Sequence, residues 1–420
     1  MDADTGRRRL PRPRLRGATW REALARKQSR LVAEFLRRNA SSKQADARGE
    51  TASRDPNIEV EIQANLSHDL LYQIFMLLPA ESLFRLQFVC KQWFGVINSS
   101  VFVSSHARKS ETVLVSQQMA FWPRGCVGMP KAYFHFLSLD GLRSSFVESS
   151  VDDLGSVRAS YDGLILGFNS RRKRLVLMNP ITGKYVDLPL AVSCHHLCES
   201  FGIAFCSEAK TYKVVHLFRE VLGGVGCEIL SVETRKWRRI EEPLELVRIR
   251  QNPVSVGGSL HWLGARRGRD CFVSLDVCDE KFVTKQLPVK RAWGDRLVEI
   301  AGGLGFVSRA EVNALEVWIL SELGGECWIK RCRIDLRVDF VHCVPVCSRR
   351  DGKEIVLECV KGRLCVYDFG REELRLVSSG SSDGCGGDGG GEEPWFGKIN
   401  RRYIPHWNTL VSCGDQSVIT

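Results

Sequence analysis

Residues 66–93 read LSHDLLYQIFMLLPAESLFRLQFVCKQW. Within this stretch, Leu70, Ile74 and Leu77 recur at the spacing of one face of an α-helix. Ser67 is a residue type that caps a helix N-terminus well, because its hydroxyl can accept a hydrogen bond from a free backbone amide. The stretch therefore predicts an amphipathic helix that begins just after Ser67.

Pro79 ends this helix, since it lacks an amide hydrogen, and it can open the next one. Leu83 and Leu86 continue the apolar pattern, and a third helical stripe follows at Cys90, Trp93, Phe94 and Ile97. Three helices in about 35 residues are too few to bury so many apolar side chains among themselves. We therefore expect this unit to keep apolar surface for a protein partner.

The chain has 420 residues and a net charge of +11, most of which lies in its first 50 residues. These hold fourteen Lys or Arg against six Asp or Glu, a local charge of +8. We expect residues 1–56 to be a disordered basic tail with a short helix at 18–38. Two interpretations of the tail remain open: a nuclear-import or anionic-surface arm, and a solvated segment. A basic arm on a nearly neutral body predicts no nucleic-acid partner.

No apolar run is long enough to span a bilayer, and no secretory signal opens the chain. No membrane association is therefore expected.

From about residue 111 onward, short apolar runs alternate with turn residues, a pattern typical of β-strands. A strand–turn–strand unit recurs, with starts at Arg174, Cys227, Cys271, Leu315 and Arg363. These starts are 44–53 residues apart, which is the period of four-stranded propeller blades. Residues 112–150 predict a further, poorer blade, and residues 399–413 predict a strand that closes the ring.

The expected fold is therefore α+β and multidomain. A small three-helix unit at 57–105 precedes an all-β, propeller-like domain at 106–420 with about six blades. The Gly/Ser-rich residues 378–393 are expected to form a flexible loop in that domain.

Sixteen cysteines are scattered through the chain. Without a secretory signal they are expected to be reduced thiols that pack as small apolar side chains. Two sets have metal-ligand residue types: Cys194, His195, His196 and Cys198 with Cys206, and Cys327 and Cys332 with Cys343 and Cys347. Neither set has the usual Cys-x2-Cys spacing of a zinc site. We therefore expect no metal and no other cofactor.

The sequence contains no Gly-x-Ser-x-Gly elbow, P-loop or dinucleotide fingerprint. The glycine clusters at 223–226 and 302–305 predict turns between strands instead. The basic run at 170–174 lies between two strand-like stretches, which favours an exposed hairpin loop over a nuclear-import signal. Together these patterns favour a non-catalytic protein.

The stretch at 66–93 resembles an F-box. The family pattern occurs here with its usual spacing as Leu66-Ser67, Ile74-Phe75, Leu78-Pro79 and Val89-Cys90-Lys91-Gln92-Trp93. Ser67 replaces the proline of many family members, which we expect to alter adaptor affinity at most. The later part resembles the F-box-associated or kelch-like domain of plant F-box proteins, on Asp162-Gly163-Leu164, Asn179-Pro180-Ile181-Thr182 and Gly258-Ser259-Leu260-His261-Trp262-Leu263.

This resemblance implies the substrate-recognition subunit of a Skp–cullin–F-box E3 ubiquitin ligase in the nucleus and/or cytoplasm. The F-box would bind a Skp-type adaptor and, through it, cullin, while the β domain would recruit an unidentified target protein. Carried over by position, the adaptor-binding residues are Leu66, Ser67, Leu70, Leu71, Ile74, Leu78, Pro79, Leu83, Val89, Cys90, Lys91 and Trp93. Packing within the module is an alternative role for Leu77, Leu86 and Ile97.

Two alternative functions stay open. One is a propeller-based scaffold or binding protein that acts outside a ubiquitin ligase. The other is a propeller enzyme, which would need convergent polar side chains at the central channel. Target recognition is expected on loops at one face of the propeller. The tryptophans considered as anchors are Trp122, Trp237, Trp262, Trp293, Trp318, Trp328, Trp395 and Trp407.

Overall fold

The computed structural model describes most of the chain beyond residue 66. The described ranges are 67–121, 131–139, 144–191, 199–220, 224–240, 247–249, 251–265, 270–321, 327–336, 342–359, 362–377, 395–398 and 403–413. Residues 66–420 form one compact unit. The predicted tail helix, Leu66 and the Gly/Ser-rich loop lie outside the described residues.

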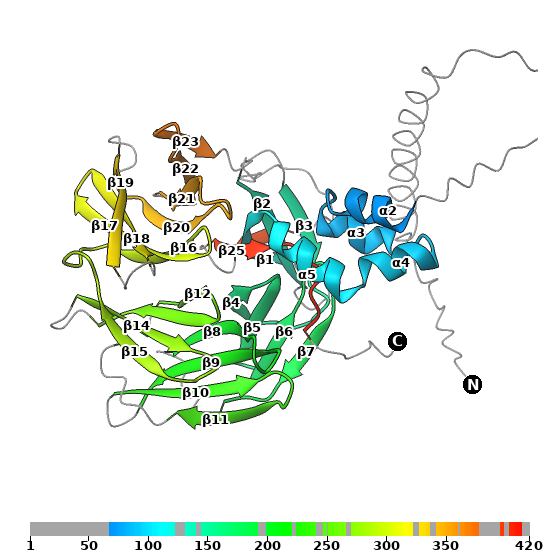
Figure 1. The fold of residues 1–420 in the computed structure, drawn as a ribbon. Coiled ribbons are helices and arrows are strands. Elements are labelled where there is room, and N and C mark those ends of the chain that lie inside the picture. The colour runs from blue at the N-terminus through cyan, green and yellow to red at the C-terminus, as the bar shows by residue number, and fades with distance from the viewer. Residues whose placement is uncertain are drawn as a thin grey trace, which may run out of the picture. The chain divides into compact units, whose positions relative to one another are not determined.

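Four helices come first in the described chain (Figure 1). They are α2 (His68–Phe75), α3 (Ala80–Leu86), α4 (Lys91–Ile97) and α5 (Ser100–Lys109). The Ser67 hydroxyl accepts a hydrogen bond from the Leu70 amide at 3.3 Å, so the predicted N-cap is confirmed. Pro79 stands at the N-cap of α3, also as predicted. Among the described residues, no helix is long and apolar enough to cross a membrane.

Helix α5 was not predicted, and it extends the helical module four residues past the expected boundary at 105. Its sequence, SVFVSSHARK, is rich in serine and valine, which are weak helix formers. Two features compensate for this: the Ser99 hydroxyl caps its first turn, and the Phe102 ring is fully buried against the other helices. Tertiary packing therefore overrides the local preference.

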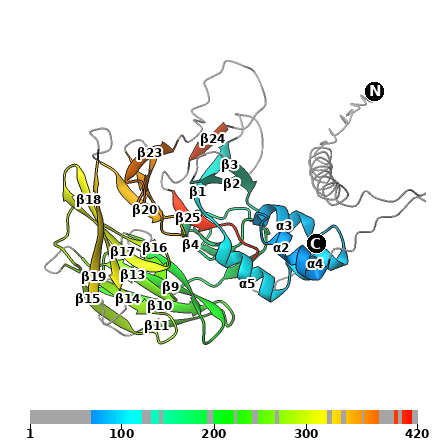
Figure 2. The ribbon, with the colours of Figure 1, turned by 45° about the horizontal axis from the view of Figure 1, so that its top comes forward.

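Six antiparallel sheets follow, which we number as blades 1 to 6 (Figures 1 and 2). Blade 1 contains β1 (Thr112–Phe121), β2 (Lys131–Ser138), β3 (Ser144–Glu148), β24 (Trp395–Lys398) and β25 (Ile404–Trp407). Blade 2 contains β4 (Ser156–Tyr161), β5 (Leu164–Asn169), β6 (Arg174–Met178) and β7 (Tyr185–Leu188). Blade 3 contains β8 (Glu199–Cys206), β9 (Thr211–Arg219), β10 (Val225–Ser231) and β11 (Lys236–Ile240).

The remaining blades repeat this order. Blade 4 contains β12 (Val254–Val256), β13 (Ser259–Leu263), β14 (Cys271–Asp276) and β15 (Phe282–Gln286). Blade 5 contains β16 (Arg296–Ile300), β17 (Gly303–Glu311), β18 (Ala314–Ser321) and β19 (Cys327–Asp335). Blade 6 contains β20 (Val344–Ser348), β21 (Glu354–Glu358), β22 (Leu364–Asp368) and β23 (Glu373–Val377). The prediction of a six-bladed, all-β propeller behind a helical module is confirmed, and the repeated units are the outer hairpins of blades 2 to 6.

The two ends of the β domain meet in blade 1. Strand β25 pairs antiparallel with the start of β1, with Thr112 opposite Trp407 and Val115 opposite Ile404. Strand β24 pairs with the end of the same strand. Both views show β25, in red, beside β1 (Figures 1 and 2). Closure of the ring by the C-terminal segment is therefore confirmed, and blade 1 depends on it for its inner strands.

The turns predicted at the two glycine clusters are found only in part. Gly224 and Gly302 adopt left-handed backbone angles just before β10 and β17, whereas Gly226, Gly303 and Gly305 lie within those strands. Residues 170–173 form the turn between β5 and β6, and Arg171 and Arg172 are exposed there. The basic run is therefore an exposed hairpin turn, as predicted.

The cysteines depart from expectation at one point. Cys343 and Cys359 form a disulfide, whereas reduced thiols were predicted throughout. Of the two metal-ligand sets weighed from spacing, Cys194 to Cys198 lie outside the described residues. In the second set, Cys343 joins Cys359 rather than Cys347, because strand register and not sequence spacing decides which thiols meet.

Candidate adaptor-binding surface

The helical module has a small core of its own. Phe75 and Phe102 are fully buried at its centre, with their rings edge-to-face at 6.5 Å between centroids. Trp93 from α4 packs edge-to-face on Phe75 at 5.1 Å. His106 of α5 approaches the end of the α2 segment, with Nε2 2.8 Å from the Leu78 carbonyl oxygen. Since a carbonyl only accepts, Nε2 carries the proton, and burial lowers the pKa of His106.

Many large apolar side chains of this module remain in solvent. Twelve such residues are exposed in the described chain, and six of them belong to the helical module: Leu70, Leu77, Phe88, Val89, Phe94 and Val101. Leu77 is 84% exposed and Phe88 is 72% exposed. So much apolar surface on so small a module marks a site of protein interaction.

The structure places most of the predicted adaptor-binding residues at the surface of this module. Ser67, Leu70, Pro79, Val89, Cys90 and Lys91 are exposed, and Ile74, Leu78 and Trp93 are half-buried. Leu66 lies outside the described residues. Their contact with an adaptor stays a prediction.

Leu71 and Leu83 lie in the core of the module rather than at its surface. They are 1% and 0% exposed, in the core around Phe75 and Phe102, so packing within the module is their role in the structure. Ile97 is also buried, as the packing alternative expected, whereas Leu77 is the most exposed of the large apolar residues. Helical spacing could not separate these roles, because the apolar pattern runs on from Leu70 and Leu71 in α2 to Leu77 and Leu78, which lie in the turn after the helix.

Phe88 and Val101 were missed by the sequence analysis. Phe88 lies in the turn after α3, and Val101 opens the unpredicted helix α5. A signal for Phe88 was available, since it is a large aromatic residue directly before the Val89-Cys90 motif. No comparable signal existed for Val101.

The end of the chain ties the helical module to the propeller. Just beyond β25, the Asn408 side chain donates a hydrogen bond to the Glu81 carboxylate of α3. The Asn408 carbonyl accepts one from the Ser110 hydroxyl at 3.1 Å. Leu410 packs against both the helical core and the core between blades 1 and 2. The segment after β25 therefore fastens the helices to the ring.

A second link comes from blade 6. Arg350, in the turn between β20 and β21, donates hydrogen bonds to the Ala107 and Ser110 carbonyls at the end of α5. Its guanidinium lies 4.9 Å from the centre of the Trp407 ring, in a cation–π contact. The module is thus attached through both α3 and α5.

These links define two faces of the propeller. In an antiparallel sheet, successive turns lie at alternate ends of the strands. The Arg350 turn joins the first and second strands of its blade, so such turns lie at the helical end. Turns between second and third strands, and the connections between blades, lie at the opposite end, which we call the distal face.

Trp293 is the most exposed tryptophan in the described chain, at 63%. It lies in the connection between blades 4 and 5, on the distal face. The neighbouring Asp295 carboxylate accepts hydrogen bonds from the amides of Ala292 and Arg309, at 2.6 and 2.9 Å. The Arg309 guanidinium in turn donates to the carbonyl of Val312, itself exposed. The Asp295 carboxylate therefore fixes the loop that carries Trp293, because one of its oxygens binds the loop at Ala292 and the other binds β17 at Arg309.

The other described tryptophan side chains are less exposed to solvent than Trp293. Trp262 is buried at 1% exposure, and Trp237, Trp318, Trp328 and Trp407 are half-buried. The side chains of Trp122 and Trp395 lie outside the described residues.

A cavity of about 540 Å³ lies at the centre of the ring and is lined from all six blades. Polar groups converge in this cavity, as a propeller enzyme would require. Two of them, Arg158 and Glu199, form an ion pair with each other at 3.4 Å. The Ser160 hydroxyl on its wall lies 2.8 Å from Nδ1 of His406. Burial lowers the pKa of His406 to about 3, so this imidazole is too weak a base to activate the serine near neutral pH.

Comparison with known proteins agrees with this architecture. Residues 134–378 match the F-box associated beta propeller domain, and residues 68–105 match the F-box-like family. The chain is 24% identical over 357 residues to F-box protein CPR1 of Arabidopsis thaliana, covering 75% of this chain and 84% of that protein. It is 24% identical to F-box/kelch-repeat protein At3g04660 of the same plant, over 65% and 74% of the two chains.

TolB from Acinetobacter baumannii, a solved structure, aligns with a TM-score of 0.41 and 13% identity over 69% of this chain and 68% of that chain.

A helical module with an exposed apolar surface, fastened to a six-bladed propeller, is the architecture of F-box proteins that carry a propeller domain. With the matches to both domains, the chain belongs to the F-box proteins that carry an F-box associated β-propeller domain. Its family role is that of a substrate adaptor of ubiquitin ligases.

Proposed function

We propose that this protein is the substrate-recognition subunit of a Skp–cullin–F-box E3 ubiquitin ligase. Its helices bind a Skp-type adaptor, and through the adaptor a cullin, while the propeller recruits the target protein. The observation that carries this proposal is the exposed apolar surface of the helical module, on a stretch with F-box spacing. We further propose the nucleus and/or cytoplasm as its location, because such ligase subunits meet their targets there.

The attachment of the helices to the propeller supports a role in presenting a target. Hydrogen bonds from Arg350 and Asn408 join the two parts, together with packing around Leu410. Such a junction holds a propeller-bound target at a fixed position relative to the adaptor, which favours repeated modification of one region of the target.

Co-purification from plant cells under proteasome inhibition tests this proposal. The wild-type chain should bring down a Skp-type adaptor, a cullin and a small set of further proteins. Replacing Leu77 and Phe94 by aspartate should remove adaptor and cullin together, because two charges would enter an apolar interface. Retention of the cullin by this double variant would contradict the proposal. Adaptor binding without a cullin would favour the scaffold alternative.

For the target, we propose the distal face of the propeller, with Trp293 as an anchor. Tryptophan is among the residues most often responsible for binding energy at interfaces. Trp293→Ala should remove the target from the purified complex while adaptor and cullin remain. Phe146→Ala is a matched control, because Phe146 is also an exposed aromatic residue but lies in the outer strand β3. Loss of the same target in both variants, or in neither, would count against Trp293.

A further inference from the structure

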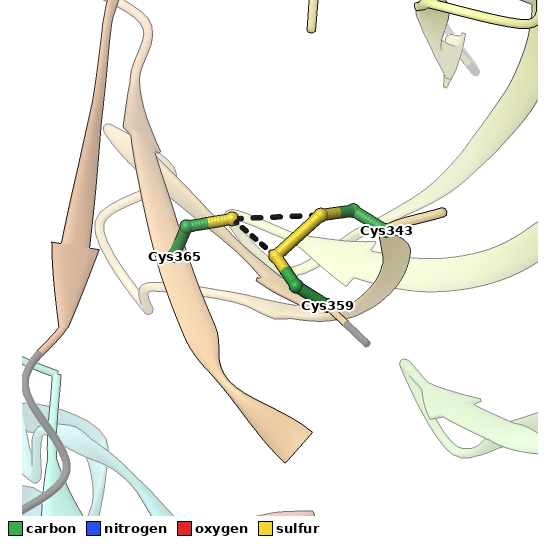
Figure 3. Close-up of side chains that lie close together, drawn as sticks. All are labelled: Cys343, Cys359 and Cys365. Atoms are coloured by element: carbon green, nitrogen blue, oxygen red, sulfur yellow. Dashed lines mark hydrogen bonds between the residues drawn. A yellow bond between two sulfur atoms is a disulfide. The ribbon is translucent and has the colours of Figure 1, made fainter. Parts of the chain in front are cut away.

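Three cysteine side chains meet at one point in blade 6 (Figure 3). Cys343 precedes β20, Cys359 follows β21, and Cys365 lies in β22. Sγ of Cys365 is 3.1 Å from Sγ of Cys359 and 3.9 Å from Sγ of Cys343. All three residues are buried. No contact described so far for the adaptor surface, the distal face or the cavity uses this cluster.

Strand register explains why these thiols converge. Val344 is opposite Glu358, so Cys343 and Cys359 face each other just beyond the ladder between β20 and β21. Cys365 is opposite Leu357, two residues before Cys359 and therefore on the same face of the sheet. That face packs against blade 5 in a shared apolar core. The cluster is thus built by three segments of one blade and shut off from solvent.

The third thiol is badly placed to exchange with the disulfide. A thiolate attacks a disulfide along the S–S axis, so the attacking sulfur lies much closer to one sulfur of the bond than to the other. The two distances from Cys365 are 3.1 and 3.9 Å, a difference of 0.8 Å. Figure 3 likewise shows Cys365 beside the disulfide rather than in line with it. A disulfide relay therefore does not account for the position of Cys365.

We propose that, in the reduced protein, these three sulfurs bind one soft closed-shell cation, of the class of Cu(I). Thiolate donors select Cu(I), zinc and iron–sulfur clusters over harder metals. Protein-bound zinc is almost always four-coordinate. The described cluster offers three buried sulfur atoms, which suits a monovalent ion that accepts three ligands.

The disulfide between Cys343 and Cys359 must be reduced before the cation can bind. Two small thiols of the glutathione type are oxidised to their disulfide, and their two electrons and two protons convert Cys343 and Cys359 to thiols. The incoming cation then displaces thiol protons, so its affinity rises with pH.

One positive group stands close by. Nη2 of Arg309 donates a hydrogen bond to the Cys343 carbonyl at 2.5 Å. The guanidinium charge offsets part of the negative charge that thiolates would bring into the core. The bound ion would also join the segment before β20 to the β21–β22 turn, at the distal end of blade 6, and so stabilise this blade against unfolding.

The test is a Cu(I) titration of the full-length chain, reduced with dithiothreitol and desalted under anaerobic conditions. Competition with a coloured Cu(I) chelator should report one tight equivalent. X-ray absorption of the loaded protein should show three sulfur neighbours and neither nitrogen nor oxygen. Cys365→Ser should weaken Cu(I) binding at least about 100-fold. Zinc, offered in parallel, should bind less tightly.

Cys347→Ser is the matched control, since Cys347 is a buried thiol of the same blade outside the cluster. It should bind Cu(I) as the wild type does. The measurements on the wild type alone keep the proposal falsifiable if a variant fails to fold. Absence of a tight equivalent, nitrogen or oxygen ligands, or a Cys343–Cys359 disulfide that survives reduction would each overturn it.

Discussion

Leu71 and Leu77 show how differently two leucines of one F-box can act. The first is buried beside Phe75, and the second stands almost entirely in solvent. Leu71→Ala should lower the free energy of unfolding by about 2–4 kcal/mol, because it leaves a cavity in the core. Leu77→Ala should change it by less than about 0.5 kcal/mol. Urea unfolding of both variants checks this; similar losses would contradict the assigned roles.

His406 makes the propeller sensitive to acid. The pKa of His406 is about 3 in the folded protein and near 6.5 in the unfolded chain. Its contribution to the free energy of unfolding is therefore complete above pH 6.5 and is lost as the pH falls toward 3. At pH 4.5 the unfolded chain takes up a proton that the folded chain does not, which lowers the free energy of unfolding by about 3 kcal/mol. The His406→Asn variant should therefore lose less stability than the wild type between pH 7 and pH 4.5.

Urea unfolding of both proteins at the two pH values gives this difference. His261, whose pKa burial lowers to about 4, remains in both proteins, so the variant should keep part of the acid sensitivity. Identical losses in the two proteins would show that His406 does not titrate as its burial demands.

Among the secondary-structure elements, β25 has the largest role for its length. Four residues supply the inner partner of β1 and carry His406 and Trp407 into the ring. Truncation after Glu393, which removes β24 and β25, should expose β1 to rapid amide exchange, because its backbone loses a hydrogen-bonded neighbour. Truncation after Cys413 retains every described contact and serves as the control. Hydrogen exchange measured by mass spectrometry compares the two, and equal protection of β1 would refute ring closure by β25.

How far each element could be predicted depends on the range of its contacts. The first three helices followed from local spacing and capping, as at Ser67 and Pro79. The blade repeats followed from alternation and turn residues, which are also local. Helix α5 did not, because its stability comes from Phe102 and His106 in tertiary contacts. The burial of Leu71 and the meeting of Cys343 with Cys359 depend on which face packs where, and no single-sequence pattern contains that information.

At the scale of the whole molecule, Arg350 is one of the groups that couple the helices to the ring. Arg350 contributes two hydrogen bonds and a cation–π contact to this junction. Arg350→Ala should cost about 1–3 kcal/mol and speed amide exchange in α5, while blades 3 and 4 keep their protection. Arg371→Ala, at an exposed turn of the same blade, is the control. Exchange that rises equally in every blade would instead indicate general destabilisation.

Because the helices are attached to the ring, the helical surface and the distal face belong to one compact unit. We propose that the first binds the adaptor and the second binds the target. Substitutions on the distal face, such as Trp293→Ala, should leave adaptor binding unchanged, and substitutions on the helices should leave the propeller folded. The helical surface combines a match to the F-box-like family with exposed apolar side chains, so the proposed adaptor binding is the most direct point to test.

That binding can be measured by titrating the purified full-length chain with a purified Skp-type adaptor in a calorimeter. The wild type should bind tightly, and the double variant Leu77→Asp with Phe94→Asp should bind at least about 100-fold more weakly. Leu376→Asp, at an exposed leucine of β23, should bind within about 2-fold of the wild type. Equal affinity of all three proteins, or no binding by the wild type, would contradict the assignment of the helical surface as the adaptor site.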